Sequence, residues 1–154
     1  MKKTILVLAV IFISVATTQA QKTMVSIAAN AGIPTTTGWS FAVGGDLQAD
    51  FAATEGLKIT VSGGYESFTL KKDFGGGSFG LVPLLAGAKF NLGSEKLYGH
   101  AQLGYSFGTA KGSTGSFTYA PSIGYYFSPN FDASLKYMGF DHLGDIAVRL
   151  AYNF

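Results

Sequence analysis

The sequence predicts an all-β fold, an eight-stranded antiparallel up-and-down transmembrane β-barrel. Three observations support this prediction: apolar and polar residues alternate with a period of two, the alternating runs are long, and turn-forming residues separate them. The chain is 47% hydrophobic but only 13% charged, and it contains no cysteine, which excludes disulfides and thiol chemistry. A chain with so many apolar side chains and so few charges must bury them either in a large core or against lipid.

The alternation is clearest in the C-terminal stretch 146–154. Its apolar set occupies every second position: Ile146, Val148, Leu150, Tyr152 and Phe154. A period of two is that of a β-strand with one apolar face. On a soluble edge strand such a face would favour aggregation, so we expect it to contact lipid.

Seven further alternating runs precede this stretch, separated by clusters of Gly, Ser, Asn, Asp or Pro. The eight predicted strands are 23–31, 39–52, 57–68, 79–92, 97–108, 117–127, 131–140 and 144–154. Most of them reach the length of about nine to eleven residues that a tilted strand needs to cross a bilayer. The connections after the second, fourth and sixth strands are tight, whereas the others are longer or Gly-rich. This pattern is typical of an outer-membrane barrel with both termini in the periplasm.

Residues 1–20 are predicted to be a cleaved signal peptide, which leaves residues 21–154 as the barrel domain. A basic start, the apolar run 5–13 and the small-residue site 18–20 follow one another in the order of a secretory signal. The apolar run is much shorter than the roughly 20 residues of a membrane-spanning helix. Beyond the signal, acidic and basic residues balance, so there is no electrostatic case for a nucleic-acid partner.

The charged residues of the predicted strands all fall on the polar faces, which face the lumen of a membrane barrel. On the second strand, for example, Trp39 and Phe41 fall on the apolar face and Ser40 on the polar face. The fourth strand is the least regular, because Leu81 and Leu85 fall on its polar side.

A soluble barrel with an apolar interior would show the same alternation. Three features oppose it. The polar faces carry too few charges for a water-exposed surface, and the apolar faces carry aromatic side chains too bulky for the interior of an eight-stranded barrel. Aromatic residues also recur near the strand ends, as they do in the girdles of membrane barrels.

The polar faces together predict a lumen cluster. Its members are Asp46, Asp50, Lys58, Glu66, Lys89, His100, Asp132, Lys136, Asp145 and Arg149. Across the turn after the second strand, Asp50 is expected to lie opposite Lys58, and His100 is expected to face Lys89. We interpret the cluster as a structural plug of ion pairs and hydrogen bonds, and the alternative is an ion path.

The leader, the eight runs and the terminal segment 148–154 (Val-Arg-Leu-Ala-Tyr-Asn-Phe) resemble the small outer-membrane β-barrel proteins of Gram-negative bacteria. The likeness is to the OmpA-transmembrane-domain and OmpX type, often grouped with porin-like surface antigens. It implies a monomer in the bacterial outer membrane, in contact with outer-membrane lipid and lipopolysaccharide. It also implies that Leu150, Tyr152 and Phe154 form the assembly signal read by the barrel-assembly machinery.

Three classes of function follow from this sequence. A structural or surface-interaction role with a side-chain-filled lumen is the first, a narrow porin-like channel for ions or small solutes is the alternative, and a lipid-modifying enzyme is the most distant. An enzyme is not expected, because a lipid hydrolase needs a Ser–His pair and His142 has no serine beside it in the sequence. His100 and His142 do not have the spacing of zinc ligands, and we expect no metal, cofactor or catalytic residue.

Overall fold

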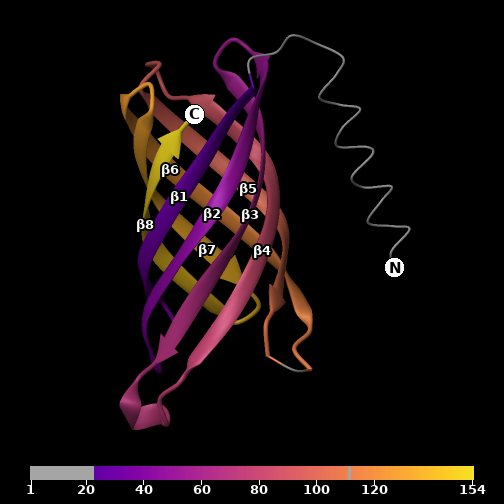
Figure 1. The fold of residues 1–154 in the computed structure, drawn as a ribbon, viewed down its shortest axis with the longest axis vertical. Coiled ribbons are helices and arrows are strands. Elements are labelled where there is room, and N and C mark those ends of the chain that lie inside the picture. Colours follow the sequence, from indigo (N-terminus) through magenta and orange to yellow (C-terminus); the bar gives the residue numbers. More distant parts are fainter. Residues whose placement is uncertain (1–22, 111) are drawn as a thin grey trace, which may run out of the picture.

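The computed structural model describes residues 23–110 and 112–154, and the predicted signal peptide lies outside them. The described residues form eight antiparallel strands that close into one barrel (Figure 1). The strands are β1 (Thr23–Pro34), β2 (Trp39–Thr54), β3 (Leu57–Leu70), β4 (Ser78–Asn91), β5 (Leu97–Gly108), β6 (Gly115–Ser128), β7 (Phe131–Phe140) and β8 (Leu143–Asn153). Each strand pairs with the next, and β8 pairs with β1, so the predicted up-and-down barrel is confirmed. No helix in the described part of the chain is long and apolar enough to span a membrane.

The two ends of the barrel carry different connections (Figure 1). The connections β1–β2, β3–β4, β5–β6 and β7–β8 lie at one end, here called the loop end. The connections β2–β3, β4–β5 and β6–β7 lie with the C-terminus at the other, the turn end. The predicted contrast between long and tight connections is wrong at two places, because the β7–β8 connection comprises only 141–142 and the β4–β5 connection spans 92–96.

The outer wall of the barrel is apolar along its middle and aromatic near both ends. Exposed aliphatic side chains cover the middle: Ile27, Leu47, Ile59, Leu103, Ile123, Leu135 and Val148. Exposed aromatic side chains form two girdles, Phe41, Tyr105, Phe107 and Phe117 near the loop end and Tyr125, Phe127, Phe131, Tyr152 and Phe154 near the turn end. A continuous apolar surface of this kind is rare on soluble proteins, and the two girdles match the interfaces of a bilayer.

The interior has two layers, because inward-facing residues differ between the two ends. Toward the loop end, seven buried side chains form an apolar cluster: Ala42, Phe68, Leu81, Leu85, Ala120, Met138 and Phe140. The inward assignment of Leu81 and Leu85 is therefore confirmed, since 2% and 5% of these residues are exposed. Toward the turn end, the interior is polar.

The predicted orientation of Trp39 is wrong. A β-bulge between Trp39 and Phe41 shifts the register of β2 against β3. An extra residue reverses the alternation, so Trp39 faces inward and its ring lies edge-on to Phe68 at a centroid distance of 6.1 Å. Ser40, predicted to face the lumen, is exposed.

Candidate functional site

The structure places all ten residues of the predicted lumen cluster on strands β2 to β8. Asp46 and Lys58 are partly buried and the other eight are buried. The residues lie in three groups along the barrel, and each group is built on a different set of contacts.

The first group, nearest the turn end, centres on Asp50. Lys89 Nζ lies 2.7 Å from Asp50 Oδ2, and Gln48 Nε2 donates a hydrogen bond to Asp50 Oδ1 at 2.6 Å. The Lys89 ammonium also lies over the ring of Tyr98, 4.8 Å from its centroid, as in a cation–π contact. This carboxylate and this ammonium therefore satisfy each other inside the barrel.

The predicted pairing of Asp50 with Lys58 is wrong. The turn at residues 55–56 and a bulge between Ala52 and Thr54 set the register, which places Ala52 opposite Lys58 and moves Asp50 further along the strand. The Lys58 ammonium lies instead near the Tyr126 ring, 5.5 Å from its centroid.

His100 lies opposite Lys89, as predicted. Its Nε2 atom lies 2.8 Å from the hydroxyl oxygen of Thr60, which belongs to β3. The imidazole thus connects β5 to β3 across the lumen, past the intervening β4.

The second group centres on Arg149. Its guanidinium binds Asp46 in a bidentate manner, with Nη2–Oδ1 at 2.7 Å and Nε–Oδ2 at 3.0 Å. Asn30 Nδ2 donates a further hydrogen bond to Asp46 Oδ2 at 3.0 Å. Arg149 Nη1 lies 3.9 Å from Asp132, whose two carboxylate oxygens accept hydrogen bonds from Tyr98 and Asn153.

The third group, beside the apolar cluster, is not balanced. Lys136 Nζ lies 4.0 Å from Glu66 Oε2, and Asp145 lies beside Glu66. Among the described residues, no amide, hydroxyl or cationic group donates a hydrogen bond to Glu66 Oε1 or to the carboxylate oxygens of Asp145, and the two carboxyl groups contact each other. Acidic members of the lumen cluster outnumber the basic members by one, and Asp145 is the carboxylate without a cation of its own in the described part of the chain.

Little free space remains inside the polar layer. The cavity beside Asp46, Glu66, Lys136 and Arg149 has a volume of about 20 Å³. This is the room needed for about one water molecule. The arrangement can hold the strands together through charge-assisted hydrogen bonds.

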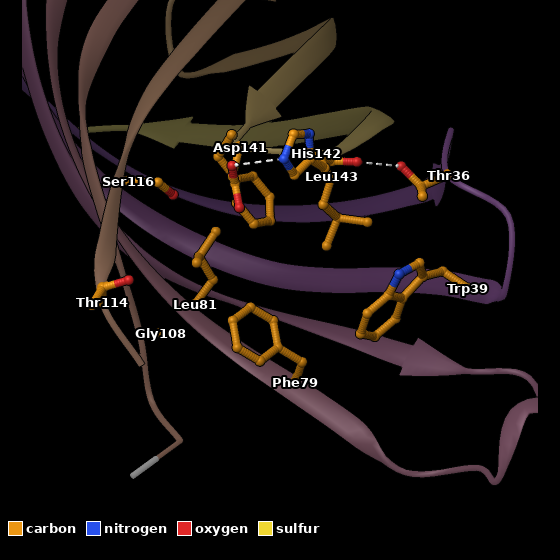
Figure 2. Close-up of a pocket in the computed structure, with 11 residues that line it drawn as sticks. Thr36, Trp39, Phe79, Leu81, Gly108, Thr114, Ser116, Asp141, His142 and Leu143 are labelled. Carbon is orange, nitrogen blue, oxygen red and sulfur yellow. Dashed lines mark hydrogen bonds and ion pairs between the residues drawn. The ribbon is translucent and has the colours of Figure 1, made fainter. Parts of the chain in front are cut away.

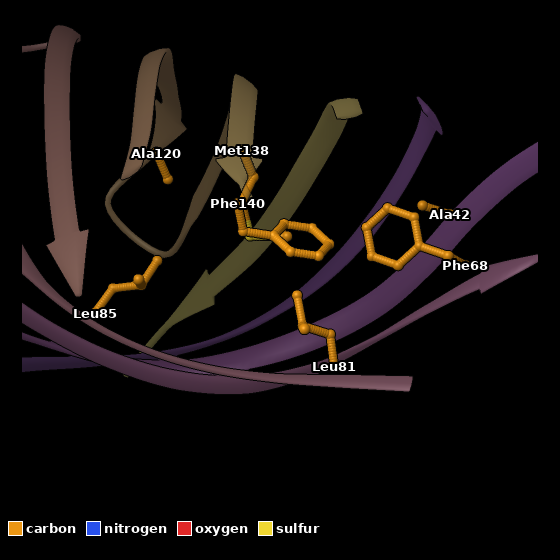
Figure 3. Close-up of a cluster of buried hydrophobic side chains, with 7 residues drawn as sticks. All are labelled: Ala42, Phe68, Leu81, Leu85, Ala120, Met138 and Phe140. Atoms are coloured by element: carbon orange, nitrogen blue, oxygen red, sulfur yellow. The ribbon is translucent and has the colours of Figure 1, made fainter. Parts of the chain in front are cut away.

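A larger cavity opens at the loop end and is here called the mouth pocket (Figure 2). Its volume is about 360 Å³, and its residues come from β1–β2, β4, β5–β6 and β7–β8: Thr36, Trp39, Phe79, Leu81, Gly108, Thr114, Ser116, Phe140, Asp141, His142 and Leu143. The floor is continuous with the apolar cluster through Leu81 and Phe140 (Figure 3). This pocket could not be predicted from the sequence, because its walls come from distant segments and because the alternation places Trp39 on the outer wall.

His142 has no serine beside it in the sequence, but the mouth pocket brings Ser116 to the same cavity. Ser116 and His142 both line the pocket, but no hydrogen bond joins them in the residues that the structure describes. The His142 ring instead faces Asp141, with Nε2 3.5 Å from Oδ1, and 97% of the His142 side chain is exposed. A nucleophile and its base normally lie about 2.6–3.2 Å apart, so this geometry is not that of a Ser–His pair.

No three His, Asp or Glu side chains converge as metal ligands in the described ranges.

The three residues of the predicted assembly signal lie at the end of the chain on the outer wall. Leu150, Tyr152 and Phe154 are exposed, and the Tyr152 and Phe154 rings meet edge-on at 4.9 Å. Phe154 N donates a hydrogen bond to the carbonyl oxygen of Val25 at 2.9 Å, which fixes the chain end against β1. The role of these residues in assembly stays a prediction.

No protein-family model matches the chain, and no curated protein matches it. Solved structures do. Ail, the attachment invasion locus protein of Yersinia pestis, was solved in complex with the heparin analogue sucrose octasulfate. It superposes with a TM-score of 0.62 at 17% identity, over 88% of this chain and 100% of that chain. The N-terminal β-barrel domain of Pseudomonas aeruginosa OprF gives a TM-score of 0.59 at 16% identity, over 87% of this chain and 99% of that chain. The chain has the fold of small outer-membrane β-barrels.

A de novo designed transmembrane β-barrel matches this fold as well, with a TM-score of 0.60 at 19% identity over 85% of this chain and 95% of that chain. The resemblance drawn from the sequence is therefore confirmed at the level of the fold. At such identities the likeness concerns the fold alone, and a function has to be argued from the side chains of this chain.

Proposed function

We propose that the chain is a small integral protein of a bacterial outer membrane, with a structural or surface-interaction role and a lumen closed by its own side chains. The observation that carries this proposal is the two-layer interior, in which a paired polar layer lies beneath an apolar one. Fold comparison alone does not separate a closed barrel from a narrow channel, so the proposal rests on these contacts.

The two layers oppose ion passage in different ways. In the polar layer, an ion would have to displace the bidentate Arg149–Asp46 contact and the Lys89–Asp50 pair. In the apolar layer it would meet Met138, which is fully buried, and would lose its hydration without compensation. An eight-stranded barrel is narrow enough for side chains to fill it.

The surface-interaction role is supported by the β3–β4 loop, the most protruding part of the loop end (Figure 1). It contains the short 3-10 helix η1 (Lys72–Phe74) and exposes an aromatic ring, since 59% of Phe74 is accessible. Lys71 and Lys72 are exposed beside it. An apolar ring flanked by cations on a protruding loop is suited to contact with another molecule.

The proposed setting follows from the outer wall. Lipid, including lipopolysaccharide, would cover the apolar belt, with the loop end outside the cell and both ends of the chain in the periplasm. Export would use the signal at 1–20, and the barrel-assembly machinery would read Leu150, Tyr152 and Phe154. The barrel closes on itself without a partner chain, and we propose that it is a monomer with no enzymatic activity.

Planar-bilayer recording of the purified, folded protein tests the closed lumen. We expect no steady conductance from the wild type. Arg149→Met should leave Asp46 without its bidentate partner and lower the stability to urea. The stability of Arg149→Lys should lie between those of the wild type and Arg149→Met, because a lysine keeps the positive charge but cannot make the bidentate contact. Stable, ion-selective wild-type channels, with altered selectivity but unchanged stability in Arg149→Met, would establish the channel instead.

A further inference from the structure

We propose that the mouth pocket binds an uncharged aromatic molecule of one or two rings that carries a hydroxyl group. This inference does not depend on whether the lumen conducts, because it concerns only the cavity above the apolar cluster.

The volume suits a ligand of this size. The pocket encloses about 360 Å³. An apolar cavity of about 150 Å³ is known to hold a benzene molecule, and small-molecule sites in proteins usually begin near about 300 Å³. One ring, or two fused rings with a substituent, would therefore fit without filling the opening.

Three aromatic side chains line the cavity. Trp39 and Phe79 meet at a centroid distance of 6.4 Å with an interplanar angle of 59°, and the Phe140 ring also lines the cavity (Figure 2). Aromatic rings prefer edge-to-face or offset neighbours at centroid distances of about 4.5–7 Å, so a guest ring can make such contacts here.

The bulge in β2 gives Trp39 a place that the alternation does not predict. Without it, this indole would belong to the aromatic girdle of the outer wall, where tryptophans of membrane proteins gather. The register shift between Trp39 and Phe41 turns it into the mouth instead, and the ring stays partly exposed there. Bulges frequently redirect a side chain next to a functional site.

Hydroxyl groups lie on the side walls of the pocket. Leu81 and Phe140 lie at the floor, whereas Thr114 and Ser116 turn hydroxyl groups into the cavity and the Thr36 hydroxyl donates to the His142 carbonyl (Figure 2). Among the described residues, the Ser116 hydroxyl makes no hydrogen bond of its own, so it can accept one from a ligand. A bound molecule would thus place its rings against the aromatic side chains and its hydroxyl group beside Ser116.

The charges favour a neutral guest. Among the described residues of the lining, the charged or titratable side chains are Asp141 and His142, and 67% and 97% of these side chains are exposed to water. A charged ligand would gain little from such hydrated groups and would lose hydration against the apolar floor.

Hydrogen bonds join described parts of the loops around the rim. Thr36 Oγ1 donates to the carbonyl oxygen of His142 at 3.0 Å, which joins the first connection to the last. Thr109 N donates to the carbonyl oxygen of Gly80 at 2.9 Å, which joins β5–β6 to β4. A pocket formed before the ligand arrives loses less freedom on binding than a flexible one.

Trp39 is the single tryptophan of the chain, so its fluorescence reports directly on the pocket. The probe is 2-naphthol, titrated into the full-length protein folded in phosphatidylcholine vesicles. We expect saturable quenching by 2-naphthol and at least ten-fold weaker binding of naphthalene-2-sulfonate. Ser116→Ala should weaken 2-naphthol roughly two- to ten-fold, the value of one neutral hydrogen bond, and leave naphthalene unchanged.

Two variants separate pocket binding from partition into the lipid. Ser116→Phe fills the pocket and should weaken 2-naphthol at least ten-fold, whereas Ala31→Phe adds the same side chain on the exposed outer face of β1 and should have no effect. If Ser116→Phe does not fold, Thr114→Phe, on the same wall, serves the same test. Linear quenching that is equal in all variants would overturn the proposal, and equal binding of the sulfonate would overturn its chemistry.

Discussion

Lys89 and Asp50 form an ion pair of 2.7 Å although their strands, β4 and β2, are not neighbours in the sheet. Strand β3 lies between them, so the pair spans part of the lumen. Their side chains are only 3% and 1% exposed, which means that neither charge can turn to bulk water. This pair holds together a part of the wall that backbone pairing reaches only through β3.

Asp50→Asn should destabilise the barrel. The substitution keeps the size of the side chain but leaves the Lys89 ammonium buried without its carboxylate. Removing one partner of a buried pair usually costs about 3–5 kcal/mol, and water inside the lumen would reduce that value. Urea unfolding from lipid vesicles measures the loss. An unchanged midpoint would show that the pair contributes nothing.

Asp145→Asn should behave in the opposite way and serves as the matched control. This side chain is fully buried, no amide, hydroxyl or cationic group among the described residues donates a hydrogen bond to it, and its carboxyl group contacts that of Glu66. Because the substitution removes the one acidic charge in excess, we expect the urea midpoint to stay the same or to rise. A loss as large as that of Asp50→Asn would show that the contact between Asp145 and Glu66 stabilises the barrel.

The orientation of the barrel can be tested with single cysteines, since the chain has none of its own. Asp73→Cys in the β3–β4 loop should react with an impermeant thiol reagent on intact cells, whereas Glu95→Cys in the β4–β5 turn should react only after permeabilisation. Both side chains are exposed on the protein surface, so a difference in labelling would report on which side of the membrane each residue lies. Reversed labelling would place the loop end in the periplasm.

Phe154→Asp should leave the precursor exported but poorly inserted, because the resemblance makes this chain end the assembly signal. Phe127→Asp is the control: it places the same charge on another exposed ring of the same girdle, away from the chain end. The heat-modifiable form in outer-membrane fractions measures insertion. Equal insertion of the two variants would remove the special role of Phe154.

The strands and their faces could be predicted because alternation is a local property of a β-strand. The charged side chains on β2 to β8 follow it, and so do Leu81 and Leu85, which looked irregular only because the apolar layer of the interior is invisible in the sequence. Trp39 could not be placed, because a bulge between two apolar residues leaves no trace in the pattern.

Contacts between side chains across the lumen could not be predicted from the sequence for a different reason. Asp50 pairs with Lys89 and not with Lys58 because the register of each hairpin and the curvature of the wall decide which side chains meet. A shift of one pair moves a carboxylate away from its expected partner. The mouth pocket likewise forms only where distant segments of the chain meet, such as those that contain Trp39 and Leu143.

The pairing of β8 with β1 has a kinetic consequence. Its register runs from Ser26 opposite Asn153 to Pro34 opposite Asp145, so the two edges of the sheet meet only after nearly the whole chain has been arranged. Loop-closure entropy makes such a distant contact slow to form. Once formed, it leaves no strand edge from which the ring can unzip. We therefore expect escape from the folded state to be all-or-none and slow, so that the lifetime of the barrel in the bilayer is set by the rupture of this one ladder.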